Sequence, residues 1–454
     1  MSDSSLLCEA EDFNGLETAV WELACSWGRR KLEAYLRHLD RKLMAERSPG
    51  LRHVGVRERT LVTRMGEVVL RRAYYVDLET GRYRYLLDEA LKLPPRERAS
   101  RGFKAEAVAQ AAEESFRRAA RAMGDKVSHS SVHRWLWELG AAFRRQVEAS
   151  RRRVFGAGEV LKAAVGTVAA LFCEADGVVL HLQREARKLI EAKLAVMHAG
   201  WRRLHPSGGG FRLKDKLVYA AIQDGRRFWE SLSVVAGRRW DLSAVKVIGG
   251  DGADWVKEGL DYFAGAVYQL CRFHLARKIR ECLRGRALAR VFAVRHDPAR
   301  LLEEAREAVA AASDPEARRR ARELLDYLLA NREGLEDYRR RVKVEGVELR
   351  GLGGIEGNAD KVISDRMKKR GMAWVVEGAR NMLGVLTLKS NGWLEATAQA
   401  VWGPGDPEPA GGREHQRRPG GGSSGVRVAH PPILDSGRGL ARVLRRVINP
   451  SISL

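Results

Sequence analysis

Residues Leu171–Leu180 read LFCEADGVVL, an apolar run typical of a buried strand that nevertheless carries two carboxylates, Glu174 and Asp176. Burying an unpaired carboxylate costs several kcal/mol, so such an acid usually binds a cation, accepts hydrogen bonds or faces a cleft. A second run of this kind, Val245–Gly250, ends at Asp251 within KVIGGDGADW. We therefore expect two strand ends that present carboxylates to one metal site. An Asp followed by Gly can equally form a simple turn, and neither stretch alone decides between these readings.

The segments after Asp176 predict a mixed sheet. VVLHLQREARK, EAKLAVMHAGW and KLVYAAI indicate antiparallel strands with one polar face, and a helix near Phe228–Val235 leads to the strand before Asp251. WVKEGLDYF then indicates a helix, AVYQLCRFH a strand and LARKIRECLRG another helix. Three antiparallel strands followed by alternating helix and strand is the order of a ribonuclease-H-like domain. In that fold one acid lies on the first strand and a second follows the fourth, where Asp176 and Asp251 fall.

A site for two divalent ions needs a third carboxylate, because ions roughly 4 Å apart must be held from both sides. Residues 285–343 form a charged, Ala- and Arg-rich block that indicates an inserted helical subdomain without an obvious candidate. After it, LGGIEGNADKVISDRMKKR, residues 352–370, places glycines before Glu356 and a basic amphipathic helix behind it. Glu356 is therefore the candidate third acid, although a glutamate in a first helical turn also complements the helix dipole.

Composition limits the class of protein. The chain has 454 residues and a net charge of +23, from 81 Lys and Arg against 58 Asp and Glu. This balance is too basic for a typical metabolic enzyme and favours a polyanion, most simply nucleic acid, although a membrane or ribosome partner would also fit. No apolar run is long enough to span a bilayer, and the acidic start MSDSSLLCEAEDF differs from a secretory signal, so we expect a cytoplasmic protein. Five scattered cysteines argue against a disulfide framework.

The N-terminal part predicts elements that could contact DNA. Residues 12–48 have the spacing of an amphipathic helix, and residues 54–77 indicate a basic hairpin around Met65 and Gly66. A helix over residues 105–123, a turn at Gly124 and a second helix capped by Ser128 resemble a helix-turn-helix, whose second helix enters the major groove. That second helix would face its core with Trp135, Leu136 and Leu139. Its candidate DNA contacts are His129, Ser130, His133 and Arg134.

Several ordered motifs together resemble the ISLre-type insertion-sequence transposases of bacteria, distant relatives of the Mutator-type transposases. The motifs are RERTLVTRMGEVVLRRAYY, LLDEALKLP, VSHSSVHRWL, EADGVVLHLQRE, GGDGADWVKEGL, YQLCRFHLARKI and GGIEGNADKVISDRMKKRGMAW. The resemblance covers roughly residues 15–390 and is far more specific than any single motif. It implies a DDE-class transposase with Asp176, Asp251 and Glu356 as catalytic, metal-binding acids, two Mg²⁺ or Mn²⁺ ions, and a helical insertion before the last acid.

The implied activity is DNA strand cleavage followed by strand transfer. A phosphodiester at the element's end would be hydrolysed, and the 3′-hydroxyl so exposed would attack target DNA. The implied partners are double-stranded DNA, as terminal inverted repeats and target, and further copies of the chain in a homo-oligomer on DNA, without a membrane. The protein would be cytoplasmic and nucleoid-associated. The rival hypotheses are a catalytically inactive or domesticated DNA-binding derivative and a nuclease without strand transfer.

Two further groups have both functional and structural interpretations. Cys271 and His274 form a Cys-x₂-His pair, but no second ligand pair with suitable spacing follows, so the sequence does not favour a structural zinc site. Relatives carry a similar pair after the second acid, which implies that His274 lies near the catalytic centre, whereas a satisfied structural histidine is the alternative. Arg366 and Lys369 could contact phosphate or simply lie on a solvated helix face.

The expected fold is thus a mixed α/β or α+β protein with a ribonuclease-H-like core. Its predicted parts are an N-terminal helix and basic β unit (1–100), a helix-turn-helix-like region (101–153), the first part of the core (160–284), a helical insertion (285–345), the last part of the core with the third acid (346–395), and a Gly/Pro-rich linker with a short basic tail (396–454). We expect the linker to be disordered.

Overall fold

The computed structural model describes residues 12–160, 168–205, 208–283 and 297–403. Their contacts form two compact units. The N-terminal unit holds residues 12–110, 116–132 and 398–403, and the sheet unit holds residues 111–115 and 133–397 apart from the gaps. The predicted linker and basic tail lie, beyond residue 403, outside the described residues. Among the described helices, none is both long and apolar enough to cross a membrane.

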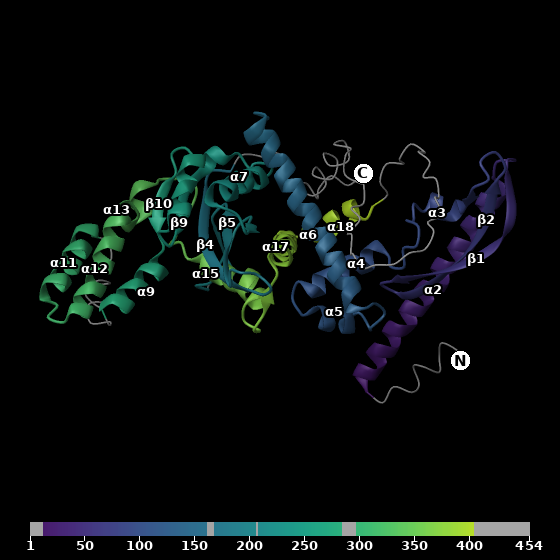
Figure 1. The fold of residues 1–454 in the computed structure, drawn as a ribbon, viewed down its shortest axis with the longest axis horizontal. Coiled ribbons are helices and arrows are strands. Elements are labelled where there is room, and N and C mark those ends of the chain that lie inside the picture. The colour runs from purple at the N-terminus through teal and green to yellow at the C-terminus, as the bar shows by residue number, and fades with distance from the viewer. Residues whose placement is uncertain (1–11, 161–167, 206–207, 284–296, 404–454) are drawn as a thin grey trace. The chain divides into compact units, whose positions relative to one another are not determined.

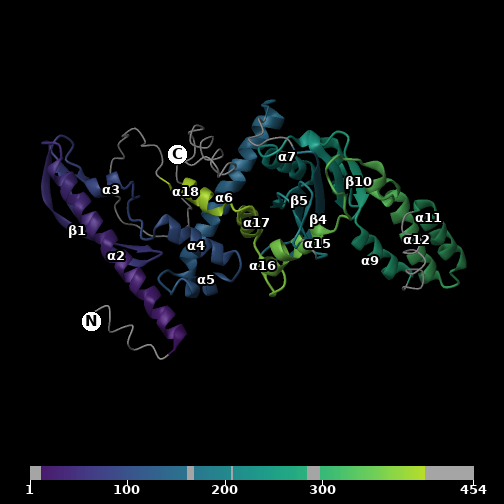
Figure 2. The same cartoon turned by 180° about the vertical axis from the view of Figure 1, so that it is seen from behind.

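The N-terminal unit consists of a long helix packed along a β-hairpin (Figures 1 and 2). Helix α2 begins after Asp12, whose carboxylate caps it by accepting from the Gly15 amide at 2.7 Å. Leu36 of this helix packs with apolar hairpin residues in one buried cluster, which explains the alternating pattern of the strands. The predicted helix and hairpin are therefore confirmed. The bounds are α2 Phe13–Ala45, β1 Leu51–Thr63, β2 Gly66–Asp77, β3 Tyr83–Arg84 and α3 Leu86–Ala90.

The segment predicted as a helix-turn-helix contains three helices rather than two. The predicted first helix is divided into α4 (Arg101–Ala111) and α5 (Phe116–Ala122). The second is α6 (His129–Arg151), and Ser128 caps it by accepting from the Ser131 amide at 3.2 Å. Along the first turns of α6 the buried and exposed faces agree with the prediction. The buried residues are Val132, Trp135, Leu136 and Leu139, and the exposed ones are His129, Ser130, His133 and Arg134.

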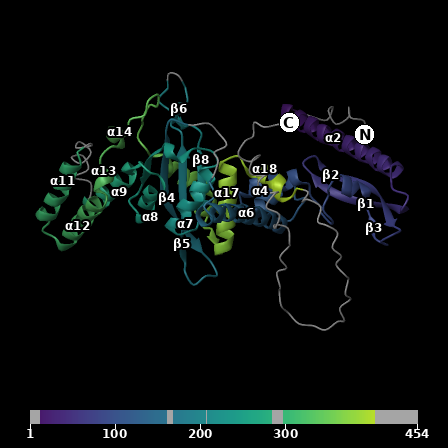
Figure 3. The ribbon, with the colours of Figure 1, turned by 90° about the horizontal axis from the view of Figure 1, so that it is seen from above.

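The sheet unit contains a mixed sheet with strand order β10-β9-β4-β5-β8. Figure 3 labels β4, β5 and β8 of this sheet. Strand β4 pairs antiparallel with β5, which pairs antiparallel with β8, whereas β9 and β10 run parallel to β4. A short strand, β11, pairs with the far end of β4. The strand bounds are β4 Leu171–Leu182, β5 Leu189–His198, β8 Leu217–Ala221, β9 Val245–Gly250, β10 Val267–Leu270 and β11 Ala373–Trp374, with β6 Trp201–Arg203 and β7 Phe211–Leu213 as a separate ribbon.

Helix α17 (Val376–Ser390) closes the edge of the sheet at β8. The Thr387 hydroxyl accepts from the Ala220 amide at 3.1 Å. Asn391, just after the helix, accepts from the Val218 amide at 2.9 Å and donates to the Val218 carbonyl at 2.7 Å. These side chains thus take the place of a further strand, which satisfies backbone groups that an edge strand otherwise leaves open.

Helix α17 also crosses α6 at two glycines. A Cβ at Gly140 of α6 would overlap the backbone of Asn381, and one at Gly384 would lie 3.1 Å from the Gly140 carbonyl oxygen. Arg144 extends the contact by pairing with Glu377 at 2.6 Å. Helix α7 (Gly225–Ala236) packs against β5 and β8, and its Glu230 pairs with Arg151 of α6. The two glycines therefore permit a close helix crossing next to the sheet.

Within the range predicted as an insertion, the described residues form helices α11 to α14. Helices α11 and α12 lie side by side (Figures 1 and 2) and are capped by Asp297 and Asp314, each followed by a proline in the first helical position. The start of the predicted insertion, residues 285–296, lies outside the described residues. The bounds are α8 Asp254–Lys257, α9 Arg272–Leu283, α11 Pro298–Ala311, α12 Pro315–Ala330, α13 Arg332–Leu335, α14 Tyr338–Arg341, α15 Gly354–Asn358, α16 Asp365–Met367 and α18 Leu394–Val401.

Candidate active site

Adjacent parallel strands bring two of the predicted acids together. Ala175 of β4 pairs with Gly250 of β9. Asp176 and Asp251 each follow these residues by one position, so they lie beside each other. Gly250 has no room for a side chain, since a Cβ there would lie 2.8 Å from the Ala175 carbonyl oxygen. Gly252 has a φ of +100°, which glycine adopts readily, and turns the chain directly after Asp251. The glycines around Asp251 thus fix its position at the end of the strand.

The third acid is held against β4 by another carboxylate. Glu174 is 2% exposed and accepts from the amides of Gly353, Gly354 and Ile355 at 2.8, 3.2 and 3.4 Å. These amides begin helix α15, which carries Glu356 one residue later. A carboxylate at the N-terminus of a helix is stabilised by the free amides and the helix dipole. Glu174 therefore connects the first strand to the segment that positions Glu356.

His274 and Cys271 complete this cluster from the end of β10 and the start of α9. His274 Nδ1 lies 3.5 Å from Glu356 Oε1, and its Nε2 lies 4.0 Å from Asp176 Oδ2. The Cys271 thiol donates to Glu356 Oε1 at 2.7 Å. The structure thus brings Asp176, Asp251, Glu356 and His274 together, as the sequence predicts, and adds Cys271. We call Asp176, Asp251 and Glu356 the acid cluster.

Within the described residues, no lysine or arginine forms an ion pair with the three side chains of the acid cluster, whose only cationic neighbour within 4.0 Å there is His274. The pKa of Asp176 is raised to about 6, chiefly by burial; His274 and the Gly177 amide lower it, and the nearby carboxylates of Asp251 and Glu356 raise it. Burial and the hydrogen bond to Glu356 also raise the pKa of the Cys271 thiol. Crowded carboxylates of this kind would be stabilised by a bound divalent cation, which prefers oxygen ligands.

The helical insertion contacts the turn that carries the second acid. The Tyr327 hydroxyl of α12 donates to the Asp251 carbonyl at 2.7 Å, and Lys257 donates to the Ala330 carbonyl at 2.9 Å. Asn331, buried after α12, lies where a side chain at Gly252 would project. The insertion therefore supports Asp251 from outside the sheet, a role that its charged sequence does not indicate.

The candidate DNA contacts have different surroundings. His129, Ser130, His133 and Arg134 are exposed at the start of α6. Lys369 is half-exposed and pairs with Asp360 and Asp365. Arg366 is only 3% exposed, donates to the Ala111 carbonyl at 2.8 Å and lies over the Trp374 ring. Burial thus corrects the expectation that Arg366 contacts phosphate, because its guanidinium already serves a structural contact.

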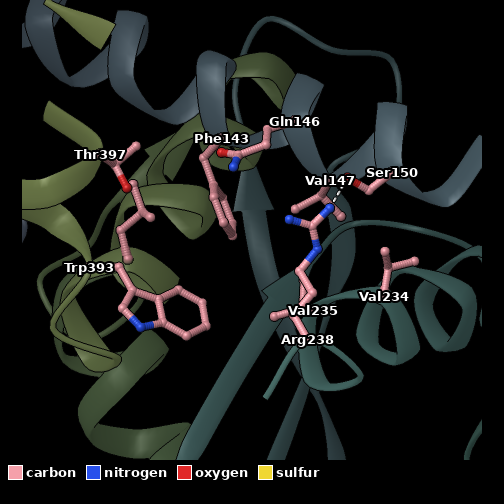
Figure 4. Close-up of a pocket in the computed structure, with 10 residues that line it drawn as sticks. Phe143, Gln146, Val147, Ser150, Val234, Val235, Arg238, Trp393 and Thr397 are labelled. Atoms are coloured by element: carbon pink, nitrogen blue, oxygen red, sulfur yellow. Dashed lines mark hydrogen bonds between the residues drawn. The ribbon is translucent and has the colours of Figure 1, made fainter. Parts of the chain in front are cut away.

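A separate cavity lies between α6, α7 and α17 and is not part of the acid cluster (Figure 4). It is about 30 Å³, room for about two water molecules, and its walls are mainly apolar, with Phe143 and Trp393 on one side. Arg238 donates to the Ser150 hydroxyl at 2.7 Å across its other side. Its size and lining indicate a packing gap rather than a substrate site.

Comparisons with known proteins give the family. Residues 6–402 match a family described as an uncharacterised protein family, UPF0236. The chain belongs to the UPF0236 family. A UPF0236 protein of Caldanaerobacter subterraneus subsp. tengcongensis, named for eleven loci, is 24% identical over 404 residues, which cover 85% of this chain and 80% of the relative. Two further UPF0236 proteins of that organism, named for four and two loci, are each 26% identical over 399 residues, covering 85% of this chain and 80% and 76% of the relatives. UPF0236 proteins thus occur in multiple copies in one genome, as mobile elements do.

Three residues at this site were not predicted in their observed roles. The sequence identifies Glu174 as a carboxylate on a strand, but its partners lie about 180 positions later. Tyr327 and the Cys271–Glu356 hydrogen bond likewise join segments that are distant in sequence. Of the three, only Cys271 has a signal in the sequence: the Cys-x₂-His spacing, which brings the side chains of Cys271 and His274 close together.

Proposed function

We propose that this protein is a DDE-class DNA transposase of an insertion sequence, which binds element ends and catalyses metal-dependent strand cleavage and strand transfer. The convergence of Asp176, Asp251 and Glu356 at one edge of the sheet carries the proposal. These residues come from segments separated by 75 and 105 positions, as 251 − 176 and 356 − 251 give. Such an arrangement of acids suits phosphoryl transfer, in which the attacking and leaving oxygens are both stabilised.

The topology supports a ribonuclease-H-like core. Numbered in chain order, the five main strands lie in the spatial order 3-2-1-4-5, with the second antiparallel to its neighbours and the last two parallel to the first. The first acid lies on the first strand and the second directly after the fourth. The third acid begins the helical segment that follows the insertion, where the resemblance to ISLre-type transposases implies it.

The residues present fit a pair of Mg²⁺ or Mn²⁺ ions. The acid cluster offers carboxylate oxygens, and the raised pKa of Asp176 reflects burial first and, to a smaller degree, the neighbouring negative charge that cations would relieve. Bound ions would supply charge stabilisation of the phosphate and a more acidic attacking group. The protein's own part is to hold the three carboxylates together: Glu174 fixes the segment of Glu356, Tyr327 supports Asp251, and His274 lies between Asp176 and Glu356.

Two observations support DNA as the partner: the positive net charge of the chain and the many gene copies of its relatives in one genome. The net charge of +23 favours a polyanion, and the exposed polar residues at the start of α6 could contact a groove or backbone. The presence of related genes at many loci of one genome is what copying of a mobile element would produce. Binding to terminal repeats would bring the phosphodiester to the acid cluster.

Strand cleavage by purified protein tests this proposal. We expect the full chain to nick labelled element ends and join them to target DNA in Mn²⁺ or Mg²⁺, and to do neither in EDTA. Asp251→Ala should lower cleavage by at least the roughly 10²-fold typical of a lost electrostatic catalytic group while leaving end binding unchanged. Cleavage by Asp251→Ala at the wild-type rate would contradict the assignment.

The same assay separates the rival functions, with gel electrophoresis resolving nicked and joined products. End binding without cleavage would indicate an inactive or domesticated DNA-binding protein. Cleavage without joining would indicate a nuclease. A matched control is Asp261→Ala, which removes a carboxylate from the 3-10 turn after α8 and outside the acid cluster, and should cleave like the wild type.

A further inference from the structure

A second ligand set overlaps the acid cluster. Cys271, His274 and Glu356 each offer one atom, Sγ, a ring nitrogen and a carboxylate oxygen, and these three atoms lie within 4.8 Å of one another. Cys271 and His274 are 7% and 9% exposed, so the thiol and imidazole are largely shielded from water. Glu356 is more exposed and faces both. We call these residues the Cys–His–Glu group.

One buried atom of this group lacks a hydrogen-bond partner. His274 Nδ1 is buried and makes no hydrogen bond within the described residues. Leaving a buried polar atom unsatisfied costs about 1–3 kcal/mol, so such an atom calls for an explanation. Its nearest described acid oxygen is Glu356 Oε1 at 3.5 Å, the same oxygen that accepts from Cys271. The unpaired nitrogen is therefore directed toward the point where the other two ligand atoms meet.

The spacing matches a tetrahedral ion with soft and borderline ligands. Zinc binds sulfur at about 2.3 Å and nitrogen or oxygen at about 2.0–2.2 Å, which puts tetrahedral ligand atoms about 3.4–3.6 Å apart. The nitrogen–oxygen distance of 3.5 Å already agrees. The sulfur–oxygen distance of 2.7 Å is shorter, so these two atoms would move apart when an ion replaces the thiol proton. Mg²⁺ and Mn²⁺ prefer oxygen ligands, so thiolate and imidazole select against them.

We propose that Cys271, His274 and Glu356 bind Zn²⁺ through three protein ligands, with the fourth position left to water. Binding replaces the thiol proton, which passes to solvent, and requires no oxidant or reductant. The consequence for catalysis rests on the proposed function: Glu356 would serve both sites, so Zn²⁺ and the catalytic ions would compete for it. Zinc would thus inhibit cleavage rather than support it.

Cobalt substitution tests the site without any assay of DNA cleavage. Co²⁺ added to metal-free full-length protein should give the near-ultraviolet charge-transfer band of cobalt thiolate, and Zn²⁺ should remove the band. Cys271→Ser should abolish it, and Glu356→Gln should weaken binding by more than the roughly 10- to 100-fold that loss of an outer-shell partner costs. Cys282→Ser is the matched control, because Cys282 is buried on the same helix outside the group, and it should keep the band.

Circular dichroism and thermal unfolding are the checks that each variant folds. A band of wild-type strength in Cys271→Ser, or no band in the folded wild type, would overturn the site. Zinc inhibition is then measured as the ratio of cleavage with and without Zn²⁺ in Mn²⁺ buffer, relative to each variant's own zinc-free rate. We expect Zn²⁺ to lower the cleavage rate at least tenfold in wild type and in Cys282→Ser, and to lower it much less in Cys271→Ser. A cobalt band without cleavage would refute the transposase proposal alone, whereas cleavage without a band would refute the zinc site alone.

Discussion

Glu174 and Asp176 lie two positions apart on strand β4, yet their surroundings give them different roles. Glu174 is fully enclosed and accepts three backbone hydrogen bonds. Asp176 accepts one, from the Gly177 amide, and its raised pKa reflects burial beside other acids. One carboxylate therefore orders the protein, and the other remains available to a ligand.

Removing the ordering carboxylate should destabilise the protein and misplace Glu356. We expect Glu174→Ala to lower the free energy of unfolding by about 1–3 kcal/mol, because three amides lose their acceptor. Cleavage should fall through the turnover rate rather than through DNA affinity, since Glu174 acts by positioning Glu356. Urea unfolding and single-turnover cleavage measure the two effects.

Two substitutions control this prediction. Glu174→Gln keeps one acceptor oxygen and should recover part of both losses. Glu303→Ala, at an exposed position of α11, should change stability by less than about 0.5 kcal/mol. Equal stability of Glu174→Ala and Glu303→Ala would exclude the positioning role.

For single residues, the sequence identified the candidate acids but not the different roles of Glu174 and Asp176. A strand puts residues i and i + 2 on the same face, so the pattern predicts that Glu174 and Asp176 point the same way. The partners that separate them, Gly353–Ile355 and His274, come from later segments. Their approach depends on tertiary folding, which local patterns do not report.

Among the elements, the crossing of α6 and α17 depends on the absence of side chains at Gly140 and Gly384. Gly140→Ala should push the helices apart and lower the free energy of unfolding by about 1–3 kcal/mol, the usual cost of overpacking. Chemical denaturation measures this change. Gly156→Ala is the matched control, because Gly156 is also helical but has open space around its Cβ position, and it should be neutral or slightly stabilising.

The stability that the contact of α6 with α7 contributes should depend on pH. Hydrogen bonds from Arg151 and Arg152 lower the pKa of Glu148 to about 2, and Arg151 also pairs with buried Glu230 of α7. A carboxyl whose pKa is lower in the folded state stabilises the protein above its unfolded value, and this contribution is lost as the pH falls. The difference in unfolding free energy between wild type and Glu148→Gln should therefore be constant above about pH 5 and shrink between about pH 4.5 and 2. A difference that does not change with pH would contradict this.

The elements also show why boundaries are harder to predict than strand pairs. The alanine-rich pattern favours one helix over residues 105–123, but α4 ends at Ala111. The carbonyl of Ala111 accepts a hydrogen bond from Arg366, 255 positions later. A contact of this kind lies outside the local pattern, and local helix propensity is only a weak preference. Strands β4 and β9, by contrast, were evident because each is a short apolar run that ends in an acid.

For the whole molecule, the excess of positive charge predicts binding that weakens steeply with salt. Each phosphate neutralised by Lys or Arg releases counterions, so the logarithm of the affinity for double-stranded DNA should fall linearly with the logarithm of salt concentration. Fluorescence anisotropy with labelled element ends measures the slope. Arg134→Ala, at an exposed position of α6, should weaken binding and make the slope less steep by about 1 if it contacts a phosphate. Affinity that does not vary with salt would contradict a polyanion partner.

The sequence predicted the order of strands and the three acids, because topology follows from local runs and their spacing. It did not predict that the insertion supports Asp251 through Tyr327, or that Cys271 joins Glu356. Both contacts form only after the chain has folded around the sheet.

The side chains that cover strand β8 have a further consequence for a cell with many copies of such a gene. Identical chains made together can exchange or add strands wherever a sheet offers unpaired peptide groups. Thr387 and Asn391 occupy those groups from within the same chain, so a neighbouring copy finds no template there. Asn391→Ala should open these peptide groups and make this margin a site of aggregation, visible by light scattering during refolding.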